Sequence, residues 1–414
     1  MRKFNKILLV IIAALTGFSR LGAQECELPV QDREISFDAY LNCVGRQNLE
    51  FLANKLNVSI ADAELAAAKV MPDPSLDFEG SKESFSLGLS YTLELGKRRF
   101  RTGLARSQKE YEQLALEQNF QDLRAQAAEL YADAMLQKEL LNVKKSSYQY
   151  MLELSRSDSL RYVAGEVNEN DARQSKLEAV TLLNDVFDQE SACYSALEEL
   201  NRFMGVQSDT LRLPSGTWQK LECKYTLPEL LEIGSKGRAD LLAAVKNVEV
   251  SRRAYKLASA ERRPDIDLSV SYERDWHHFW PQARYLTFGV SIPLTISAGN
   301  KGERRAAKYG INQAELMQRD MELQVQSEIK QAWYAFEAEK KKIDQYLQGV
   351  LGDSEKVLDG TVYQYRRGEA SILDVLMAQR TYNEVQQDYL ETMKGYVTAL
   401  VGLEKSCGIW DIHF

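Results

Sequence analysis

The residue types that most often carry out enzyme chemistry are scarce in this sequence and form no recognisable site. The chain has three histidines, of which His277 and His278 are adjacent, and five cysteines without a Cys-x-x-Cys pair. Zinc sites and disulfide frameworks need regularly spaced or even-numbered cysteines. Gly96-Lys97 lacks the spacing of a phosphate-binding loop, and no Gly-x-Ser-x-Gly occurs. We therefore predict that the protein is not an enzyme and holds neither a cofactor nor a metal.

The motifs with regular spacing are two copies of one pattern, Tyr162-x-x-Gly165-Glu166 and Tyr365-x-x-Gly368-Glu369. They are 203 residues apart, and at this offset Asp171 falls on Asp374. Earlier in the chain, Met71-Pro-Asp aligns with Arg263-Pro-Asp at an offset of 192, and Leu87-Gly-Leu-Ser aligns with Phe288-Gly-Val-Ser at 201. Similarity at a nearly constant offset indicates an internal duplication.

Strands are predicted where apolar and small or polar residues alternate strictly. This pattern covers Phe85 to Leu95, Ile266 to Tyr272 and Leu286 to Leu294, and Leu76 with Phe78 makes a weaker fourth strand. Alternation over about ten residues is typical of membrane-barrel strands, although a soluble sandwich shows it too. The residues that we expect to face lipid are Leu87, Leu89, Tyr91, Leu93, Phe288, Val290 and Ile292. The second hairpin loop, 274–284, is long and aromatic, and we expect it to touch lipid headgroups or to fold over the channel mouth.

Long helices are predicted because residues 75–213 and 294–414 contain no proline and are rich in good helix formers. A helix from Lys97 to Gly165 would be about 100 Å long at 1.5 Å per residue. Each half then combines one long helix with two shorter ones stacked end to end. The expected ranges are Ile35–Met71, Lys97–Gly165 and Gly165–Gly205 in the first half, and Leu227–Arg263, Gly302–Gly368 and Gly368–Gly408 in the second.

The N-terminus reads as an export signal, residues 1–23, with basic residues before an apolar run and small residues at the end. Gln24 and Glu25 do not resemble the residues that precede a lipidated cysteine, so acylation of Cys26 is not predicted. Removal of the signal leaves 48 basic and 60 acidic groups, a charge of −12 that argues against nucleic acid as a partner. We place the two repeats at residues 24–213 and 214–414.

Four strands cannot close a barrel, and the edges of an open sheet would leave backbone groups without partners in lipid. The subunit must therefore form oligomers if the strands lie in a membrane. Two, three or four copies would give eight, twelve or sixteen strands, and the pattern alone does not choose among them.

Over residues 35–408 the chain resembles the TolC-like outer-membrane efflux family. The resemblance rests on the duplication together with the three motifs Leu93-Glu-Leu-Gly-Lys-Arg-Arg, Ile292-Pro-Leu and Tyr365-x-x-Gly-Glu-Ala-Ser-Ile-Leu-Asp374. It implies a mainly α protomer with transmembrane β-strands, and a homotrimer whose twelve-stranded β-barrel continues as an α-helical barrel of coiled coils. It also implies a passive, porin-like exit duct in the outer membrane of a Gram-negative bacterium, contacting lipid and extending into the periplasm. A periplasmic adaptor and an inner-membrane pump, such as a resistance-nodulation-division transporter, would deliver the substrate. The Leu-Gly-Lys-Arg-Arg segment is most similar to the heavy-metal branch.

The same resemblance implies roles for residues near the two turns. Asp374 would form a ring around the pore, and Asp171 and Tyr365 would help to latch the closed state. Ala370 and Met377 depart from the pattern, since the family can carry arginine and a second ring aspartate there, so the latch would be weaker. The other role open to Asp374 is that of a helix cap. We expect the turns themselves, at Gly165, Glu166, Gly368 and Glu369, to form the periplasmic tip that meets the adaptor.

The main alternative to a channel is a periplasmic coiled-coil adaptor or a fibrous adhesin of the cell envelope. Both would use long helices, but neither explains two hairpins with a lipid-facing pattern that return to the same end of the molecule.

Overall fold

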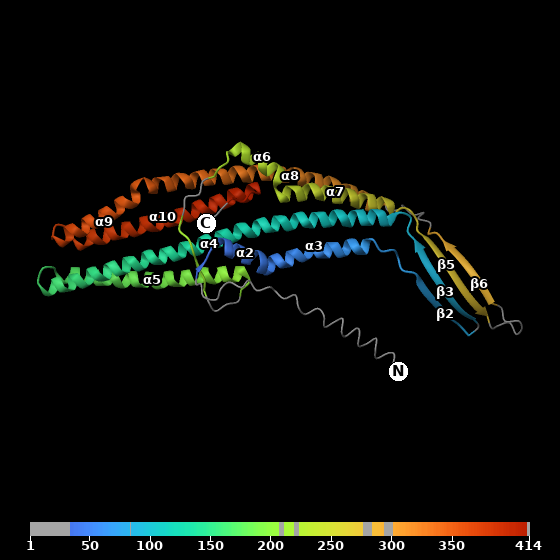
Figure 1. Cartoon of the computed structure of the whole chain (residues 1–414), viewed down its shortest axis with the longest axis horizontal. Coiled ribbons are helices and arrows are strands. Elements are labelled where there is room, and N and C mark those ends of the chain that lie inside the picture. Colours follow the sequence, from blue (N-terminus) through green and yellow to red (C-terminus); the bar gives the residue numbers. More distant parts are fainter. Residues whose placement is uncertain are drawn as a thin grey trace.

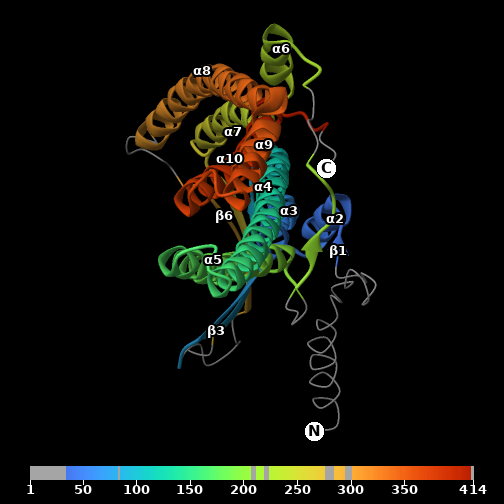
Figure 2. The same cartoon turned by 90° about the vertical axis from the view of Figure 1, so that its left-hand side faces the viewer.

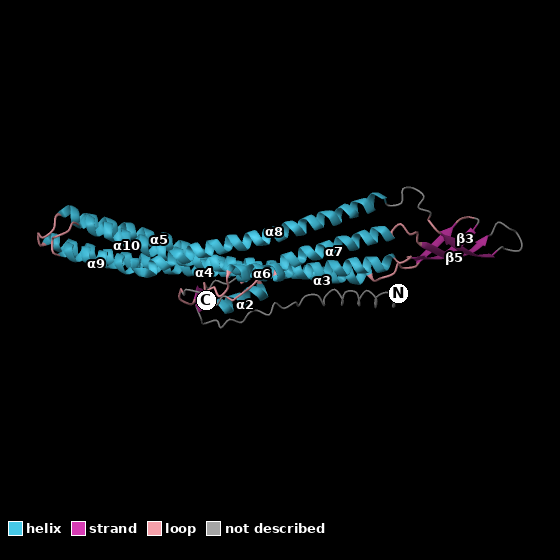
Figure 3. Ribbon diagram, turned by 90° about the horizontal axis from the view of Figure 1, so that it is seen from above, coloured by secondary structure: helices cyan, strands magenta, loops and turns pink. Residues whose placement is uncertain are grey.

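The computed structural model describes residues 34–82, 84–206, 211–218, 223–275, 284–293 and 301–411. These residues form a long, thin molecule with a β-sheet at one end and helical hairpins at the other (Figures 1 and 3). The predicted signal peptide, Cys26, and residues 276–283 of the aromatic loop lie outside the described residues. Among the helices that the structure describes, none has an apolar stretch long enough to cross a bilayer.

The sheet has four antiparallel strands in the order β2-β3-β5-β6. The strands are β2 (Ser75–Gly80), β3 (Ser84–Leu93), β5 (Ile266–Asp275) and β6 (Arg284–Ser291). Their register aligns Leu76, Leu89, Val270 and Phe288 in one cross-strand row. The adjacent row holds Ser75, Ser90, Ser269 and Gly289 instead. One face of the sheet is therefore apolar and the other is small or polar, as the alternation predicts.

The first repeat contains the long helix as predicted. Its helices are α2 (Phe37–Gln47), α3 (Leu49–Ala68), α4 (Lys97–Val163) and α5 (Glu169–Met204). At 67 residues α4 is about 100 Å long. The helices α3 and α5 lie end to end along α4, because α3 packs on the part of α4 near the sheet and α5 packs on the distal part (Figure 1).

The second repeat departs from the first at its long helix. Its helices are α6 (Leu227–Gly237), α7 (Ala239–Ala260), α8 (Lys301–Gln345), α9 (Leu351–Arg366) and α10 (Ile372–Cys407). A π-helical turn, Tyr346–Val350, separates α8 from α9, and Gly349 within it has φ of +132°. The prediction of one continuous helix from Gly302 to Gly368 was therefore wrong. Glycine adopts this left-handed backbone without a steric penalty, which allows the kink.

Each of the two shorter helices that precede the strands is also broken. Asn48 separates α2 from α3, and Arg238 separates α6 from α7. The predicted single helices Ile35–Met71 and Leu227–Arg263 were wrong in this respect. Both breaks lie near the middle of the molecule, which we call the equator.

The helices pack in one curved layer. Neighbours near the sheet are α3-α4-α7-α8, the same order as the strands that they continue, and neighbours toward the tip are α5-α4-α10-α9. Seen along the long axis, the layer runs as an arc from α8 to α5 (Figure 2). The protomer is thus an open segment with two lateral edges.

The largest hydrophobic cluster lies at the equator, where α2, α4, α5, α8 and α10 meet. Tyr131 of α4 is fully buried there, and its hydroxyl lies 2.9 Å from the carbonyl oxygen of Ile35 and 2.6 Å from that of Ser215. These contacts hold a short parallel pair, β1 (Glu34–Ile35) with β4 (Leu213–Pro214), that the sequence did not predict. The repeat boundary placed between residues 213 and 214 falls within β4 and stays a prediction.

Candidate functional site

The two turns at the tip have the same geometry. Gly165 and Gly368 follow α4 and α9 with φ of +79° and +77°. The amide of Gly165 donates to Tyr162 O (2.9 Å) and the next amide, of Glu166, donates to Arg161 O (2.8 Å); the amides of Gly368 and Glu369 repeat this pattern. Such a pair of hydrogen bonds closes a helix through a left-handed residue, which glycine supplies. The duplicated motif is therefore a duplicated helix stop.

A buried polar contact joins the two hairpins close to these turns. The Tyr365 hydroxyl, at the end of α9, donates to Asp158 Oδ1 on α4 at 2.9 Å, and the Asp158 side chain is fully buried. Asp158 Oδ2 is buried and has no hydrogen-bond partner among the described residues. The guanidinium of Arg161 lies 5.3 Å from the centroid of the Tyr365 ring and 3.9 Å from Asp158 Oδ1. We call Asp158, Arg161 and Tyr365 the tip cluster.

Burial determines the protonation of the tip cluster. It raises the pKa of Asp158, while the Tyr365 hydrogen bond and the charge of Arg161 oppose the rise. Burial also raises the pKa of Tyr365, and the Asp158 carboxylate raises it further. The charge of Asp171 acts in the same direction on both groups. The sequence-predicted residues Tyr365 and Asp171 thus share an environment, but the hydrogen-bond partner of Tyr365 is Asp158.

Asp374 and Asp171 lie in the first turns of the two returning helices, α10 and α5. Asp374 Oδ2 accepts from the backbone amide and the hydroxyl of Ser371 at 2.8 and 2.7 Å, so the two residues form a capping box at the start of α10. These bonds hold the pKa of Asp374 below its usual value. In α5 the same position is capped by Asn168, whose side chain accepts from the Asp171 amide at 2.8 Å. Asp374 therefore caps α10 and remains exposed and ionised, while its place in a pore ring stays a prediction.

The strand residues predicted to face lipid are largely uncovered in the protomer. Leu89 is 51% exposed, Phe288 73% and Val290 67%, although each lies in the middle of a strand. A soluble sandwich would cover this face with a second sheet or with helices. The described residues place nothing over it.

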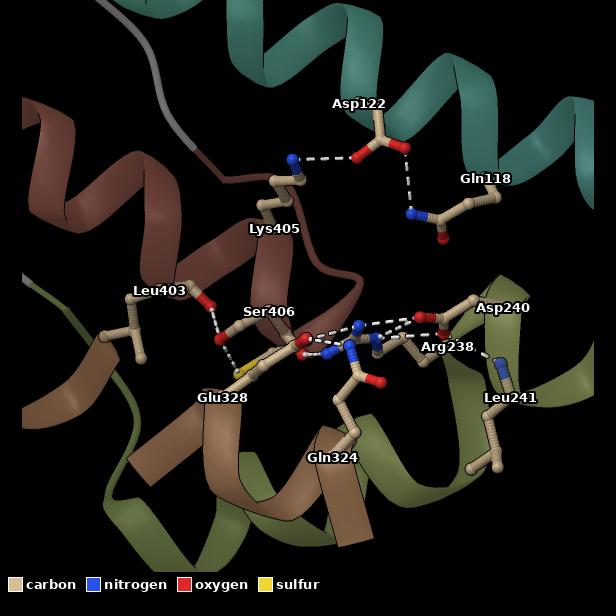
Figure 4. A network of polar contacts seen from close by, with 11 residues as sticks. Gln118, Asp122, Arg238, Asp240, Leu241, Gln324, Glu328, Leu403, Lys405 and Ser406 are labelled. Carbon is tan, nitrogen blue, oxygen red and sulfur yellow. Dashed lines mark hydrogen bonds and ion pairs between the residues drawn. The ribbon is translucent and has the colours of Figure 1, made fainter. Parts of the chain in front are cut away.

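A second polar network lies at the equator, where α6 meets α7. Arg238, only 8% exposed, binds Asp240 through Nε and Nη2 (2.9 and 2.6 Å), Glu328 of α8 (2.5 Å) and the carbonyl oxygen of Ser406 in α10 (3.1 Å). Figure 4 shows the guanidinium between the two carboxylates, with Lys405 bonded to Asp122 above it. We call this arrangement the Arg238 clamp.

The first repeat has a matching clamp at its own break. Asn48 is buried, its Nδ2 donates to the carbonyl oxygen of Phe203 at 2.9 Å, and its Oδ1 accepts from the Phe51 amide at 2.9 Å. Phe203 and Ser406 are 203 residues apart, the offset of the duplication. Both repeats therefore bind the end of their last helix, α5 or α10, to the break between their two shorter helices.

The comparisons with known proteins agree with this architecture. A family model described as "Outer membrane efflux protein" matches residues 233–409. The cobalt-zinc-cadmium resistance protein CzcC of Cupriavidus metallidurans is 23% identical over 92% of this chain and 93% of its own length. Residues 233–409 of the chain belong to the outer membrane efflux protein family. The protease secretion protein PrtF of Dickeya chrysanthemi is 23% identical over 70% of the chain and 64% of PrtF. Among solved structures, CusC superposes with a TM-score of 0.74 at 16% identity, covering 92% of this chain and 93% of CusC.

Membership decides the general role. This efflux protein is a non-enzymatic channel subunit of the outer membrane that extends into the periplasm, and it works as a homotrimer with a periplasmic adaptor and an inner-membrane pump. The match to this family therefore argues against the two alternatives, a periplasmic coiled-coil adaptor and a fibrous adhesin.

Sequence reasoning missed Asp158, Arg161 and both clamps of this efflux protein. Asp158 lies inside α4, where no motif marks it, and its partner Tyr365 is 207 residues away. The one available signal was an acidic residue on an otherwise apolar helix stripe that includes Met151 and Leu154.

Proposed function

We propose that the tip of this efflux channel is a cation-selective constriction, which the tip cluster holds narrow. The observation that carries the proposal is the buried hydrogen bond from Tyr365 to Asp158, because it ties α9 to α4 where the two hairpins end. Asp374 supports the proposal, since it lies in the first turn of α10 as an exposed carboxylate of lowered pKa. Three such carboxylates around the axis of a trimer would attract cations and repel anions.

The lateral edges of the protomer support closure with further copies. At the sheet end, α3 and α8 form the two edges of the layer, and each has an exposed apolar stripe. The stripes are Leu49, Leu52, Leu56 and Ile60 on α3, and Tyr309, Leu316 and Leu323 on α8. The α8 residues are spaced by seven, the repeat of a coiled-coil seam. We infer that α3 of one protomer packs against α8 of the next, as β2 pairs with β6.

For the cargo we infer divalent metal cations. The relative that matches over most of both chains is named for resistance to cobalt, zinc and cadmium, and an anionic tip fits such a cargo. PrtF, a protease secretion protein, makes exported protein the second candidate. Deletion of the gene and growth in graded cobalt, zinc or cadmium separates the two. Normal metal tolerance together with loss of a secreted protease would contradict the metal assignment.

The latch is tested by single-channel recording of Tyr365→Phe, which removes only the hydroxyl. This hydrogen bond contributes about 0.5–1.5 kcal/mol with a neutral carboxyl group and about 1.5–3 kcal/mol with a carboxylate, so we expect a higher open probability and larger conductance. Tyr162→Phe is the matched control, because Tyr162 holds the equivalent position in the first repeat and is exposed. If Tyr365→Phe conducts like the wild type, the tip cluster does not hold the channel narrow.

The proposed ring of Asp374 carboxylates is tested by single-channel recording of Asp374→Asn in planar bilayers. The recording uses low salt, with a trivalent cation on the periplasmic side. Asparagine keeps much of the capping geometry and removes the charge, so we expect block of the wild type and little block of the variant. Asp188→Asn, an exposed aspartate of α5 without an ion pair among the described residues, is the control. Equal block of wild type and Asp374→Asn leaves Asp374 as a helix cap alone.

We propose that the turns at Gly165 and Gly368 dock to the adaptor. A Cβ added at either glycine would meet no atom within 4 Å, so the surface of both turns is open to a partner. We expect Gly368→Trp to abolish crosslinking to the adaptor while the trimer still inserts. Gly368→Ala, which strains the backbone at the same φ without the bulk of tryptophan, should crosslink normally. Normal crosslinking of Gly368→Trp would place the docking site elsewhere.

A further inference from the structure

Basic residues gather where the helices meet the sheet. Segment 97–109, at the start of α4, has six basic residues and no acidic residue. Segment 252–263, the end of α7 and the residues that follow, has five basic residues and one acidic residue. Segment 301–308, at the start of α8, has four basic residues and one acidic residue. The whole chain, in contrast, carries a formal charge of −8. This concentration of positive charge includes the Lys97-Arg98-Arg99 motif, which the channel function leaves without a role.

The three segments are neighbours in space. α4 packs against α7 and α7 against α8, and all three helices reach the sheet end of the molecule (Figure 3). A Cβ added to Gly96, directly before α4, would lie 3.5 Å from Arg263 Nη1, and one added to Gly103 would lie 3.5 Å from Arg253 Nη1. The arginines of α7 therefore lie beside the first turns of α4.

Part of this charge is neutralised within the protomer. Lys97 binds Asp265 at 2.7 Å and Arg101 binds Glu94 at 2.7 Å. Lys109, Arg252 and Arg253 pair with Asp62, Glu315 and Glu249. Eight of the other basic residues are exposed and make no ion pair within the described part of the chain. We call them the basic collar: Arg98, Arg99, Arg106, Arg262, Arg263, Lys301, Arg305 and Lys308. Like charges at such density repel one another, and an external anion relieves that repulsion.

The position of the basic collar identifies the anion. Arg98 is five residues beyond the last residue of β3, and Arg263 is three residues before the first of β5. These two strands have the exposed apolar face that we expect to contact lipid. The collar therefore lies where the hydrocarbon ends on the periplasmic side, at the depth of the phospholipid phosphates.

We propose that the basic collar binds the phosphate groups of anionic phospholipids in the periplasmic leaflet of the outer membrane. The assignment rests on the outer-membrane placement of the sheet. A phospholipid can bind both neighbouring surfaces at once, because its acyl chains cover the apolar strands while its phosphate contacts the arginines. Dissolved phosphate would bind only the arginines. Each basic side chain close to an anionic leaflet strengthens binding by about fivefold.

The test measures lipid binding to the full-length trimer in neutral detergent by native mass spectrometry, with phosphatidylglycerol or phosphatidylcholine added. The collar variant carries Arg98→Gln, Arg99→Gln, Arg262→Gln and Arg263→Gln. The control variant removes the same charge from exposed positions far from the sheet, with Lys176→Gln, Lys330→Gln, Lys341→Gln and Arg380→Gln. We expect phosphatidylglycerol to bind the wild type and the control alike, and the collar variant at least about tenfold more weakly. Phosphatidylcholine should bind all three weakly.

Two further measurements make the result decisive. Excess inorganic phosphate should not displace phosphatidylglycerol, and competition by it would show a site for dissolved anions instead. Reversal potentials in planar bilayers should be equal for wild type and collar variant; a change of ion selectivity with unchanged lipid binding would place these arginines in the lumen and overturn the proposal. The migration of the unheated trimer in gel electrophoresis measures insertion separately. If the collar variant fails to insert, Arg98→Gln/Arg99→Gln replaces it, and equal lipid binding by that variant and the wild type refutes the collar.

Discussion

Replacement of Arg238 by glutamine should loosen the equator selectively. Glutamine keeps two of the three methylene groups of the arginine stem and removes the charge together with most of the donors. Asp240 and Glu328, with side chains 16% and 36% exposed, would then face each other without a cation, and the Ser406 carbonyl oxygen would lose its donor. The perturbation therefore removes the link that the α6–α7 break makes to α8 and α10, and it leaves the hydrophobic cluster intact.

The size of the effect follows from burial. Removing one partner of a buried ion pair costs about 3–5 kcal/mol, since it leaves an uncompensated charge. Glu328 is partly hydrated, so the lower end of that range, about 3 kcal/mol, applies here. Arg202, paired with Glu199 at the end of α5, has a side chain 67% exposed and provides the control. Loss of an exposed pair of this kind costs about 0–1 kcal/mol.

Native-state hydrogen exchange measures the loss locally. An opening free energy lowered by about 3 kcal/mol raises the exchange rate of the α10 amides near residues 403–409 by about a hundredfold, at 1.36 kcal/mol per factor of ten. The double variant Arg238→Gln/Glu328→Gln should recover part of the protection, because it removes the unpaired carboxylate. If Arg238→Gln exchanges no faster than Arg202→Gln, the Arg238 clamp contributes nothing to the equator and the reasoning fails.

Further outcomes are expected elsewhere in the chain. Leu89→Lys, on the apolar face, should cost about 2–4 kcal/mol and reduce the yield of inserted trimer, whereas Ser90→Lys should insert; equal yields would refute the lipid-facing assignment. Gly205→Ala would place a methyl group 2.3 Å from a carbonyl oxygen at the α2–α3 break, so it should lower the melting temperature clearly more than Gly165→Ala, whose Cβ meets open space at a similar φ. Burial raises the pKa of Asp158, so its contribution to stability is full below the ordinary carboxyl pKa and is lost as the pH rises through the raised one. Corrected for intrinsic rates, amide protection at the tip should therefore be higher near pH 4, about the ordinary carboxyl pKa, than at pH 8, and Asp158→Asn should reduce the difference.

The sequence predicted those parts of the fold that local physics controls. Strict alternation located the strands, and the helix stops at Gly165 and Gly368 follow from the need for a left-handed residue. The breaks at Asn48 and Arg238 could not be predicted, because arginine favours helices and asparagine is only a mild breaker. What ends these helices is the bond that each side chain makes to a carbonyl group more than 150 residues away.

The kink in the second repeat illustrates the same limit. Several glycines lie within the predicted helix Gly302–Gly368, and Gly352 and Gly360 remain helical while Gly349 does not. Nothing local separates the three. In the tip cluster, the sequence identified Tyr365 through its repeated motif, but the aspartate that accepts its hydrogen bond belongs to the other repeat and carries no motif.

The uninterrupted length of α4 has a mechanical consequence. Tyr131, held at the equator, lies near the middle of the helix, about 50 Å from either end, so α4 acts as a lever with equal arms. A tilt of about 1° about this fulcrum moves the tip by only about 0.9 Å and moves the membrane end by the same amount in the opposite direction. A sheet fixed by its strand neighbours in lipid resists such a movement. Large displacements of the tip must therefore come from the other repeat, where the joint at Gly349 uncouples α9 from α8 and lets the distal arm swing while the proximal arm stays with the sheet.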